Sequence, residues 1–407
     1  MPIQEGIYWD SGQRPGSAWG ILFLRVGLGV QATQVDAILT GLSQIYDGLR
    51  RGETPGLPGA TVPAMDLTIL IGFGPKAFAI SGAKRPLPVG LGPQYQFLSP
   101  KAAGGGVVLP GSGLTYDEGI ARNGATEEVM VQAIANSPLA VARVFVETHA
   151  YLSSQRDELT AAQLIEVAAG YTGFNREDGR SWIDFHDGVS NLRSGSERYG
   201  VAAIKRAGAP IQDRWTVDGS YLAFIRASVD LERWRNLSLN QQELAVGRTK
   251  LTGCPIDRLD GAGSALPIAT CPLNSAGSVI DPGNEAFREP PSVADPAVLA
   301  SHVQRANHHI GPTNRDVSQR IFRQGYEFID PPAPGQALRQ GLNFVSFQDN
   351  IRRLFFMLTQ PGWLGNTNFG GSNDALNMPL LRVLAAGAYL CPPKNSGETY
   401  PGQSIFT

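Results

Sequence analysis

Residues 19–51 read WGILFLRVGLGVQATQVDAILTGLSQIYDGLRR and combine two different hydrophobic patterns. The first part is a short apolar run, which predicts a strand over Trp19–Leu28. In the second part apolar residues recur at spacings of three and four, which predicts an amphipathic helix over Gln31–Arg51. Its apolar face would consist of Ala32, Val35, Ile38, Leu39, Leu42, Ile45 and Leu49. A strand followed by a helix that must bury one face favours a fold in which helices cover a sheet.

The same alternation continues through the first half of the chain. Two further apolar runs predict strands over Asp66–Gly74 and Glu127–Ala135, and helical spacing predicts a second helix over Pro138–Leu152. The resulting order is β-α-β followed by β-α. This order is typical of an α+β sandwich, in which helices lie on one face of an antiparallel sheet.

The second half shows a similar order of elements without a residue-level repeat. Predicted strands are Gly219–Ala227, Gln319–Phe328, Gln340–Phe347 and Leu381–Leu390, and predicted helices are Asp230–Arg235, Asn240–Gly247 and Asn350–Leu358. With 407 residues the chain exceeds what one hydrophobic core usually supports. We therefore expect an α+β fold of two fused ferredoxin-like units, with antiparallel sheets and helices packed on them, of the dimeric α+β barrel type. The N-terminal unit would span residues 1–175, and the C-terminal unit, residues 176–407, would carry the functional site.

Charge and hydropathy exclude several classes of partner. The formal net charge is -2, whereas nucleic acids and anionic membrane surfaces are bound by basic faces. The longest apolar run near the start, Trp19–Val30, is short for a membrane span and contains Arg25. The N-terminus lacks the pattern of a secretory signal. We expect no nucleic-acid partner, no membrane span and a cytoplasmic location, unless a leader has been removed.

Glycine and cysteine usage make two further predictions. With 48 Gly and 29 Pro, long ordered loops are expected over Arg51–Pro63, Phe97–Ala121 and Thr252–Pro291. The three cysteines are Cys254, Cys271 and Cys391. They are too few and too scattered for a disulfide scaffold or a cysteine-rich metal site, so reduced, mostly structural thiols are expected.

Three short segments that lie far apart in the chain form one chemical set. His302 stands at the head of an apolar-periodic segment and can supply an axial imidazole to haem iron. Asp187 can accept a proton from peroxide, and Arg323 can stabilise the departing hydroxide. Each residue alone has an ordinary reading: an Asp-Gly turn, a surface or capping histidine, and a solvated strand arginine. His308 and His309 are rival ligands.

These segments resemble those of the dye-decolorising peroxidase family. Asp184-Phe-His-Asp-Gly188 is similar to its Gly-x-x-Asp-Gly segment, His302–Asn307 to its proximal-histidine segment, and Arg323–Tyr326 to its distal-arginine strand. Order and rough spacing also agree. Further similar segments, between about Trp19 and Pro393, are Leu67–Pro75, Asp230–Trp234, Gly247-Arg248, Lys250–Gly253, Gly341–Gln348 and Ala386–Pro393.

The resemblance implies a role for each of these residues. Asp187 would be the distal acid, His302 the axial ligand of haem b, and Arg323 the distal arginine. Leu342 and Phe344, two apart on one strand face, would line the distal pocket, and Asn307 would lie near a haem edge. The implied enzyme uses hydrogen peroxide to oxidise small phenolic or dye-like donors through a ferryl intermediate. Two rivals are a haem-handling protein with weak turnover and a non-haem structural relative of the fold.

Other features stay open at this level. The sequence does not determine whether the protein is a homo-oligomer. Candidates for an electron relay to the surface are Trp182, Trp215, Tyr326 and Trp363, and candidates for the acceptor that orients His302 are Glu289, Asp295 and Asp349.

The chain departs from the family pattern at three places. Asp184 stands where the family has its first glycine, Leu192 replaces a frequent proline, and His308-His309 replace a frequent Pro-Arg pair. Aspartate tolerates left-handed backbone better than most residues. If Asp184 lies beside Asp187, the two carboxylates would disfavour each other's ionisation and raise the pKa of the proton acceptor. In the alternative, Asp184 faces solvent or caps a turn.

Overall fold

The computed structural model describes residues 3–10, 12–13, 15–92, 127–189, 191–192, 194–269, 271, 291–306, 320–332, 334–335, 337–351, 353–354 and 380–407. The strands of the main sheet are β1 (Ala18–Val26), β2 (Thr68–Phe73), β3 (Val129–Ala135), β4 (Ile165–Phe174), β5 (Ser220–Val229), β8 (Phe322–Arg323), β9 (Tyr326–Asp330), β10 (Arg339–Gln348) and β11 (Leu381–Cys391). The helices are α1 (Ala32–Arg50), α3 (Pro138–Ser154), α4 (Gly195–Ala202), α5 (Leu231–Asn236), α6 (Leu239–Val246), α7 (Pro296–Leu299) and α8 (His302–Ala306). Short 3-10 helices cover Pro75–Ala79, Val89–Leu91, Ile211–Thr216 and Gln403–Ile405.

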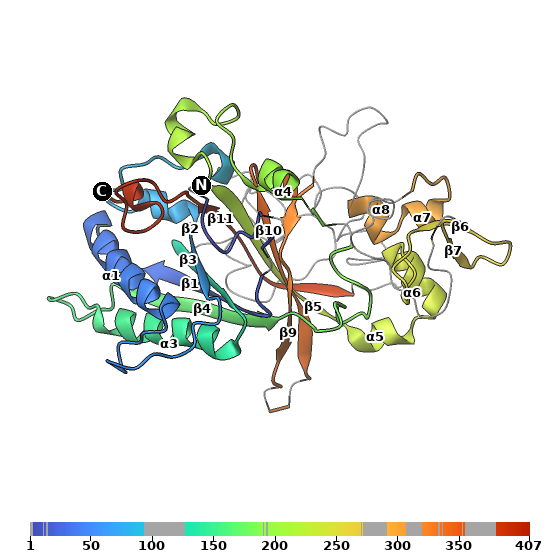
Figure 1. Ribbon diagram of the computed structural model, residues 1–407, viewed down its shortest axis with the longest axis horizontal. Helices are drawn as coiled ribbons and strands as arrows, with labels where there is room; N and C mark the ends of the chain where they lie inside the picture. The colour runs from blue at the N-terminus through green and yellow to red at the C-terminus, as the bar shows by residue number, and fades with distance from the viewer. Residues whose placement is uncertain are drawn as a thin grey trace.

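The first half forms a β-α-β-β-α-β unit with antiparallel strands in the order β2-β3-β1-β4. Helices α1 and α3 lie side by side on one face of these strands (Figure 1). This arrangement is the ferredoxin-like motif. The predicted strands and helices of this half are confirmed, with small shifts at their ends. Strand β4 was not predicted, because its sequence IEVAAGYTGF is largely half-exposed and contains two glycines, which weaken a strand pattern.

The second half repeats the strand order of the first. Its strands pair as β11-β5-β10-β9, with β8 beside the far end of β10. The halves join where β11 meets β2 and where β4 meets β9, and β5 pairs with β10. The sheet, which has nine strands within the described residues, therefore closes on itself. The predicted α+β class is confirmed. Because one sheet runs through both halves, the division at residue 175 stays a prediction.

Among the described residues, three of the five buried apolar clusters lie against the main sheet. The cluster enclosed by the closed sheet is rich in aromatic residues: Trp19 stacks on Tyr326 and Phe224, with ring centroids 5.6 and 6.1 Å apart. A second cluster joins the outer face of the first half to α1 and α3. A third lies on the outer face of β5, β10 and β11 and includes Ile225, Phe344 and Ala386. Each fully buried large apolar side chain contributes about 1.5–3 kcal/mol.

Two sequence predictions are wrong in detail. The strand predicted over Gln319–Phe328 is divided, because Gln324 and Gly325 separate β8 from β9. The loop predicted over Thr252–Pro291 contains a hairpin of β6 (Ile256–Leu259) and β7 (Ala265–Pro267). Two other predictions concern residues that the structure does not describe: the loop Phe97–Ala121 lies outside the described residues, as does part of the helix Asn350–Leu358.

The expectation of reduced thiols is wrong for two of the three cysteines. Cys254 and Cys271 form a disulfide with Cα atoms 6.3 Å apart, while Cys391 is a buried free thiol. The β6–β7 hairpin lies between the paired cysteines and returns the chain, so that residues 17 apart meet. Such a return depends on strand pairing and cannot be deduced from cysteine spacing alone.

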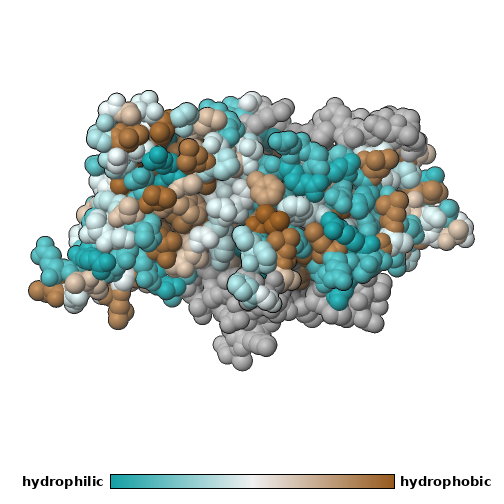
Figure 2. Space-filling model, turned by 90° about the horizontal axis from the view of Figure 1, so that it is seen from below, coloured by the Kyte–Doolittle hydropathy of each residue, from teal (hydrophilic) through white to brown (hydrophobic). Residues whose placement is uncertain are grey.

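The surface is mixed in character. On the face shown in Figure 2, hydrophobic residues lie among hydrophilic ones, as is normal for folded proteins. Among the helices that the structure describes, none combines the length and the apolar character that crossing a membrane requires.

Candidate active site

The structure brings Asp187 and Arg323 together from different elements. Asp187 lies in the loop that follows β4, and Arg323 ends the short strand β8. Arg323 Nη1 lies 3.7 Å from Asp187 Oδ1, and the two side chains remain 31% and 48% exposed. An ion pair this exposed stabilises a fold by at most about 1 kcal/mol. The pair therefore adds little to stability, and it matters because it places a carboxylate beside a guanidinium.

Asn191 fixes the backbone of Arg323, and the sequence analysis missed it. Its Nδ2 donates to the carbonyl of Arg323 at 2.8 Å, and its Oδ1 accepts from the Arg323 N–H at 3.2 Å. One amide thus satisfies both backbone groups of the arginine and ties β8 to the loop that carries Asp187. The two residues are 132 positions apart, so no local pattern could have indicated this contact.

One face of the sheet carries the predicted pocket residues. Arg323 pairs with Ser346 on β10, and residues two apart on a strand share a face, so Arg323 lies on the same face as Leu342 and Phe344. Phe344 is buried in the outer cluster of the second half, and Leu342 packs against that cluster while partly exposed. The structure therefore places a cation at the edge of an apolar wall.

His302 is the first residue of α8 and is electrostatically coupled to Arg323. The imidazole keeps part of its accessible surface, but it is surrounded by protein. This burial, together with the positive charge of Arg323, lowers the pKa of His302 to about 4. At neutral pH the ring is uncharged. An uncharged imidazole is the form that binds metal ions.

The end of α6 supports the segment that carries His302. Gly247 caps α6 in the left-handed region with φ 88°, and a Cβ at this position would collide with the side chain of Ser301. Next to it, Arg248 is 4% exposed and donates to the carbonyl of Gly253 at 2.9 Å. Burial and the charge of Arg323 lower the pKa of Arg248 to about 10. Two arginines and a neutral histidine thus share one electropositive region.

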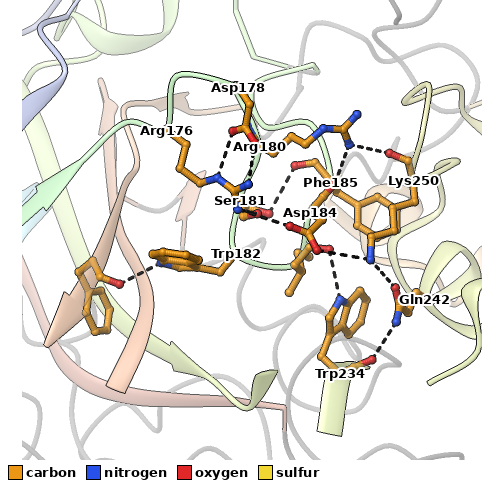
Figure 3. Close-up of polar contacts among 12 residues, drawn as sticks. Arg176, Asp178, Arg180, Ser181, Trp182, Asp184, Phe185, Trp234, Gln242 and Lys250 are labelled. Carbon is orange, nitrogen blue, oxygen red and sulfur yellow. Dashed lines mark hydrogen bonds and ion pairs between the residues drawn. The ribbon is translucent and has the colours of Figure 1, made fainter. Parts of the chain in front are cut away.

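Asp184 adopts the backbone conformation that favours glycine. Its φ is 66°, in the left-handed region. Its carboxylate pairs with Arg176 Nη1 at 3.5 Å and Lys250 Nζ at 3.7 Å, in the network drawn in Figure 3. Two cations therefore pair with Asp184, whose side chain is 46% exposed. None of the ion pairs and hydrogen bonds seen among the described residues joins Asp184 to Asp187.

The second carboxyl group near Asp187 is instead Glu327. Glu327 lies opposite Leu342 in the β9–β10 pairing and is 5% exposed. Burial, and then the negative charge of Asp187, raises its pKa to about 8. The sequence analysis missed this residue, because a glutamate on a predicted strand is most often a solvated side chain.

Several predicted residues cannot be placed. Outside the described residues lie Asn307, His308, His309, Glu289 and Trp363. Of the acceptors proposed for His302, Asp295 caps α7 by accepting from the Ala297 N–H at 2.8 Å, and Asp349 pairs with Arg353 at 2.7 Å. Both carboxylates therefore have other partners.

Comparison with known proteins decides the family. A sequence model described as the C-terminal part of Dyp-type peroxidases matches residues 178–396, more than half of the chain. This chain belongs to the Dyp-type peroxidase family. The predicted resemblance is confirmed, and with it a family of oxidoreductases that act on peroxide.

Solved Dyp-type structures share the fold over nearly the whole chain. Ferric DtpA from Streptomyces lividans superimposes with a TM-score of 0.67 at 20% identity, covering 97% of this chain and 93% of that one. A DyP-type peroxidase from Cellulomonas bogoriensis gives 0.64 at 20% identity, with 96% and 94% covered. A variant of Rhodococcus jostii DypB in complex with heme gives 0.59 at 17% identity, with 96% of both chains covered.

Curated relatives match a shorter region. Deferrochelatase from Escherichia coli is 24% identical over 173 residues, which is 42% of this chain and 35% of the relative. The match therefore spans about a third of the length of that protein.

Proposed function

We propose that this Dyp-type protein is a haem peroxidase that reduces hydrogen peroxide and oxidises small aromatic donors. The observation that carries the proposal is the coupling of three residues from three segments. Asp187 forms an ion pair with Arg323, and burial, followed by the charge of Arg323, lowers the pKa of His302. An acid, a cation and a neutral imidazole are the groups that peroxide activation on haem requires.

The residues present fit haem b. His302 offers a neutral imidazole nitrogen for the iron, and the wall of Leu342 and Phe344 offers apolar contact for a porphyrin face. Solved relatives are named as ferric DtpA and as DypB in complex with heme. Bound haem would supply the redox chemistry: it would give two electrons to peroxide and regain them one at a time from donors.

Asp187 and Arg323 would divide the proton and charge work. The carboxylate of Asp187 would take a proton from one peroxide oxygen and return it to the other oxygen as that oxygen leaves. The guanidinium of Arg323 would stabilise the negative charge that develops on the leaving oxygen, and the proton returned by Asp187 would let that oxygen depart as water. Phenolic or dye-like donors and the ferryl intermediate stay predictions of the resemblance.

A haem-handling protein with weak turnover is the second candidate, because the curated relatives are named deferrochelatase.

The cytoplasmic location also stays a prediction. The Cys254–Cys271 disulfide argues against it, since stable disulfides are typical of oxidising compartments.

The deciding experiment is an absorption spectrum of the purified, haem-supplemented protein, followed by stopped-flow mixing with peroxide and a phenolic donor. A peroxidase should show a Soret band, a rapid spectral change with peroxide, and donor oxidation that returns the starting spectrum. A Soret band with little response to peroxide would favour the haem-handling protein. Absence of the band would leave only the non-haem relative.

A further inference from the structure

Glu327 is a buried acid whose surroundings tie it to the candidate active site. It stands on the same sheet face as Leu342, its partner on β10, and next to Phe174, its partner on β4. Both neighbours in the sheet are apolar, so water has little access to the carboxyl group. The face is the one that carries Arg323, four residues earlier in the chain.

The loop between β4 and Asp187 closes over this carboxyl group. The backbone N–H of Trp182 donates a hydrogen bond to the Glu327 carboxyl group. The charge of Arg176 lowers the pKa of Glu327, but by less than burial or the charge of Asp187 raises it. The indole of Trp182 donates to the Phe328 carbonyl at 2.9 Å and meets Phe174 edge-on at 6.0 Å, which holds the loop against β9. Arg176 is itself shared with Asp178 at 2.6 Å and Asp184 at 3.5 Å.

Other charged groups nearby have partners of their own. Asp330, three residues along β9, pairs with Arg226 at 2.6 Å. Arg323 pairs with Asp187. Burial and the charge of Asp187 therefore raise the pKa of Glu327, while the hydrogen bond from the Trp182 backbone N–H and the charge of Arg176 lower it by smaller amounts.

We propose that Glu327 is a positioning residue for Asp187: it keeps its proton while Asp187 is ionised, so that the two acids present a single negative charge to Arg323. This inference rests on the proposed function. Two carboxyl groups that interact in a desolvated site share their ionisation, and the better buried one stays neutral. Asp187 is the more exposed of the two, at 48% against 5% for Glu327.

The arrangement has a consequence for peroxide activation. While Glu327 is neutral, the charge of Arg323 is opposed by Asp187 alone and remains effective on the leaving oxygen. Since the pKa of Glu327 is raised to about 8, a second negative charge enters the site as the pH rises through that value. It would oppose Arg323 and slow the reaction with peroxide. A neutral glutamine at this position cannot make that change.

Infrared difference spectra of the haem-supplemented protein test the ionisation directly, without turnover. Subtracting Glu327→Gln from wild type at pH 6 should leave the C=O band of a protonated carboxylic acid, which disappears as the pH rises through about 8. Haem propionates are common to both proteins and cancel. Without that band the proposal is overturned.

Coupling to Asp187 is tested by repeating the titration in an Asp187→Asn background. Removing the negative charge that raises the pKa of Glu327 should move its band to a lower pH. An unmoved titration would mean that burial alone keeps Glu327 neutral, and would overturn the positioning role. Glu128→Gln is the matched control: Glu128 is 9% exposed with a raised pKa, but it accepts from the Val26 N–H in the first half, so its removal should leave the Glu327 band unchanged.

The kinetic readout is the pH profile of the stopped-flow reaction with peroxide. Wild type and Glu128→Gln should lose rate above about pH 8, whereas Glu327→Gln should keep its rate there. An alkaline loss that persists in Glu327→Gln contradicts the inference. If wild type shows the infrared coupling but no reaction with peroxide at any pH, the carboxyl pair stands and the proposed peroxidase function fails.

Discussion

The two halves of the closed sheet share a strand order but use their outer faces differently. In the first half, α1 and α3 cover the face (Figure 1). Residues such as Leu22, Ile71 and Leu42 are buried in this layer. In the second half, the corresponding face carries Arg323 and Glu327 beside an apolar wall. One scaffold thus supports a mainly hydrophobic packing layer on one side and a set of interacting charged groups on the other.

The two faces have opposite effects on the stability of the fold. Apolar burial in the first half stabilises the fold at about 25 cal/mol per Å². Desolvated ionisable groups in the second half instead lower the stability of the fold. Burial therefore lowers the pKa of His302 and raises that of Glu327, and both changes favour the neutral form of the side chain. Groups held in this way are typical of functional sites. Changes in the two halves should therefore separate stability from activity.

The largest expected effect is at His302. His302→Ala should abolish stoichiometric haem retention while the far-ultraviolet circular dichroism stays unchanged, because the core of the closed sheet does not depend on this residue. The control is His149→Ala, an exposed histidine on α3 in the first half, which should keep the Soret band. A His302→Ala protein with full haem content would make the ligand assignment wrong.

Removal of either member of the ion pair should be next in size. Arg323→Leu deletes a fixed cation and should slow the reaction with peroxide by about 10² to 10³. Asp187→Ala deletes a positioned proton acceptor and should slow it by about 10² to 10⁴. Both variants should keep the Soret band, and stopped-flow absorbance measures the rate. If both react at the wild-type rate, the two roles are assigned incorrectly.

A core substitution in the first half should change stability without changing the site. Leu42 on α1 is 0% exposed, so Leu42→Ala should lower the free energy of unfolding by about 2–5 kcal/mol. Denaturant titration measures the loss, and the peroxide rate of the folded fraction should be unchanged. A parallel loss of rate would show that the two faces are coupled.

Glu327 predicts a dependence of stability on pH. Its pKa in the folded state, about 8, lies above the ordinary value of 4.5, so folding favours its protonated form. The stability it contributes is fully present below about pH 4.5 and is lost as pH rises to 8. Relative to wild type, Glu327→Gln should therefore gain stability progressively across this window, by as much as a few kcal/mol. Urea titrations from pH 5 to 8 measure this difference, and parallel curves would contradict it.

The smallest effect is expected at Asp184. Asp184→Gly removes the exposed ion pairs with Arg176 and Lys250, which stabilise the fold by at most about 1 kcal/mol. It also removes about 1 kcal/mol of backbone strain, because glycine adopts the left-handed conformation of this position without a steric penalty. The two changes oppose each other, so the free energy of unfolding should move by less than about 1 kcal/mol. The pH profile of the peroxide reaction should superimpose on that of wild type. A shifted acidic limb would show that Asp184 acts on Asp187 after all.

Local patterns were sufficient for most elements of the fold. The helix α1 and the strands β1, β2, β3, β5, β10 and β11 follow hydrophobic periodicity that can be read within twenty residues. Strand β4 escaped because half-exposed residues and glycines hide its alternation. The break between β8 and β9 escaped because Gln324 and Gly325 interrupt pairing without interrupting the apolar pattern.

The sequence by itself determined the chemical types at the site, because Asp187, His302 and Arg323 each lie in a short recognisable segment. Only the tertiary structure decided what surrounds them. Asn191 holds Arg323 across 132 positions. Strand register turns Glu327 toward the site, while two cations draw Asp184 into the loop network. Side-chain type is a property of one residue, but desolvation and register are set by neighbours brought together in folding, and these decide which acid keeps its proton.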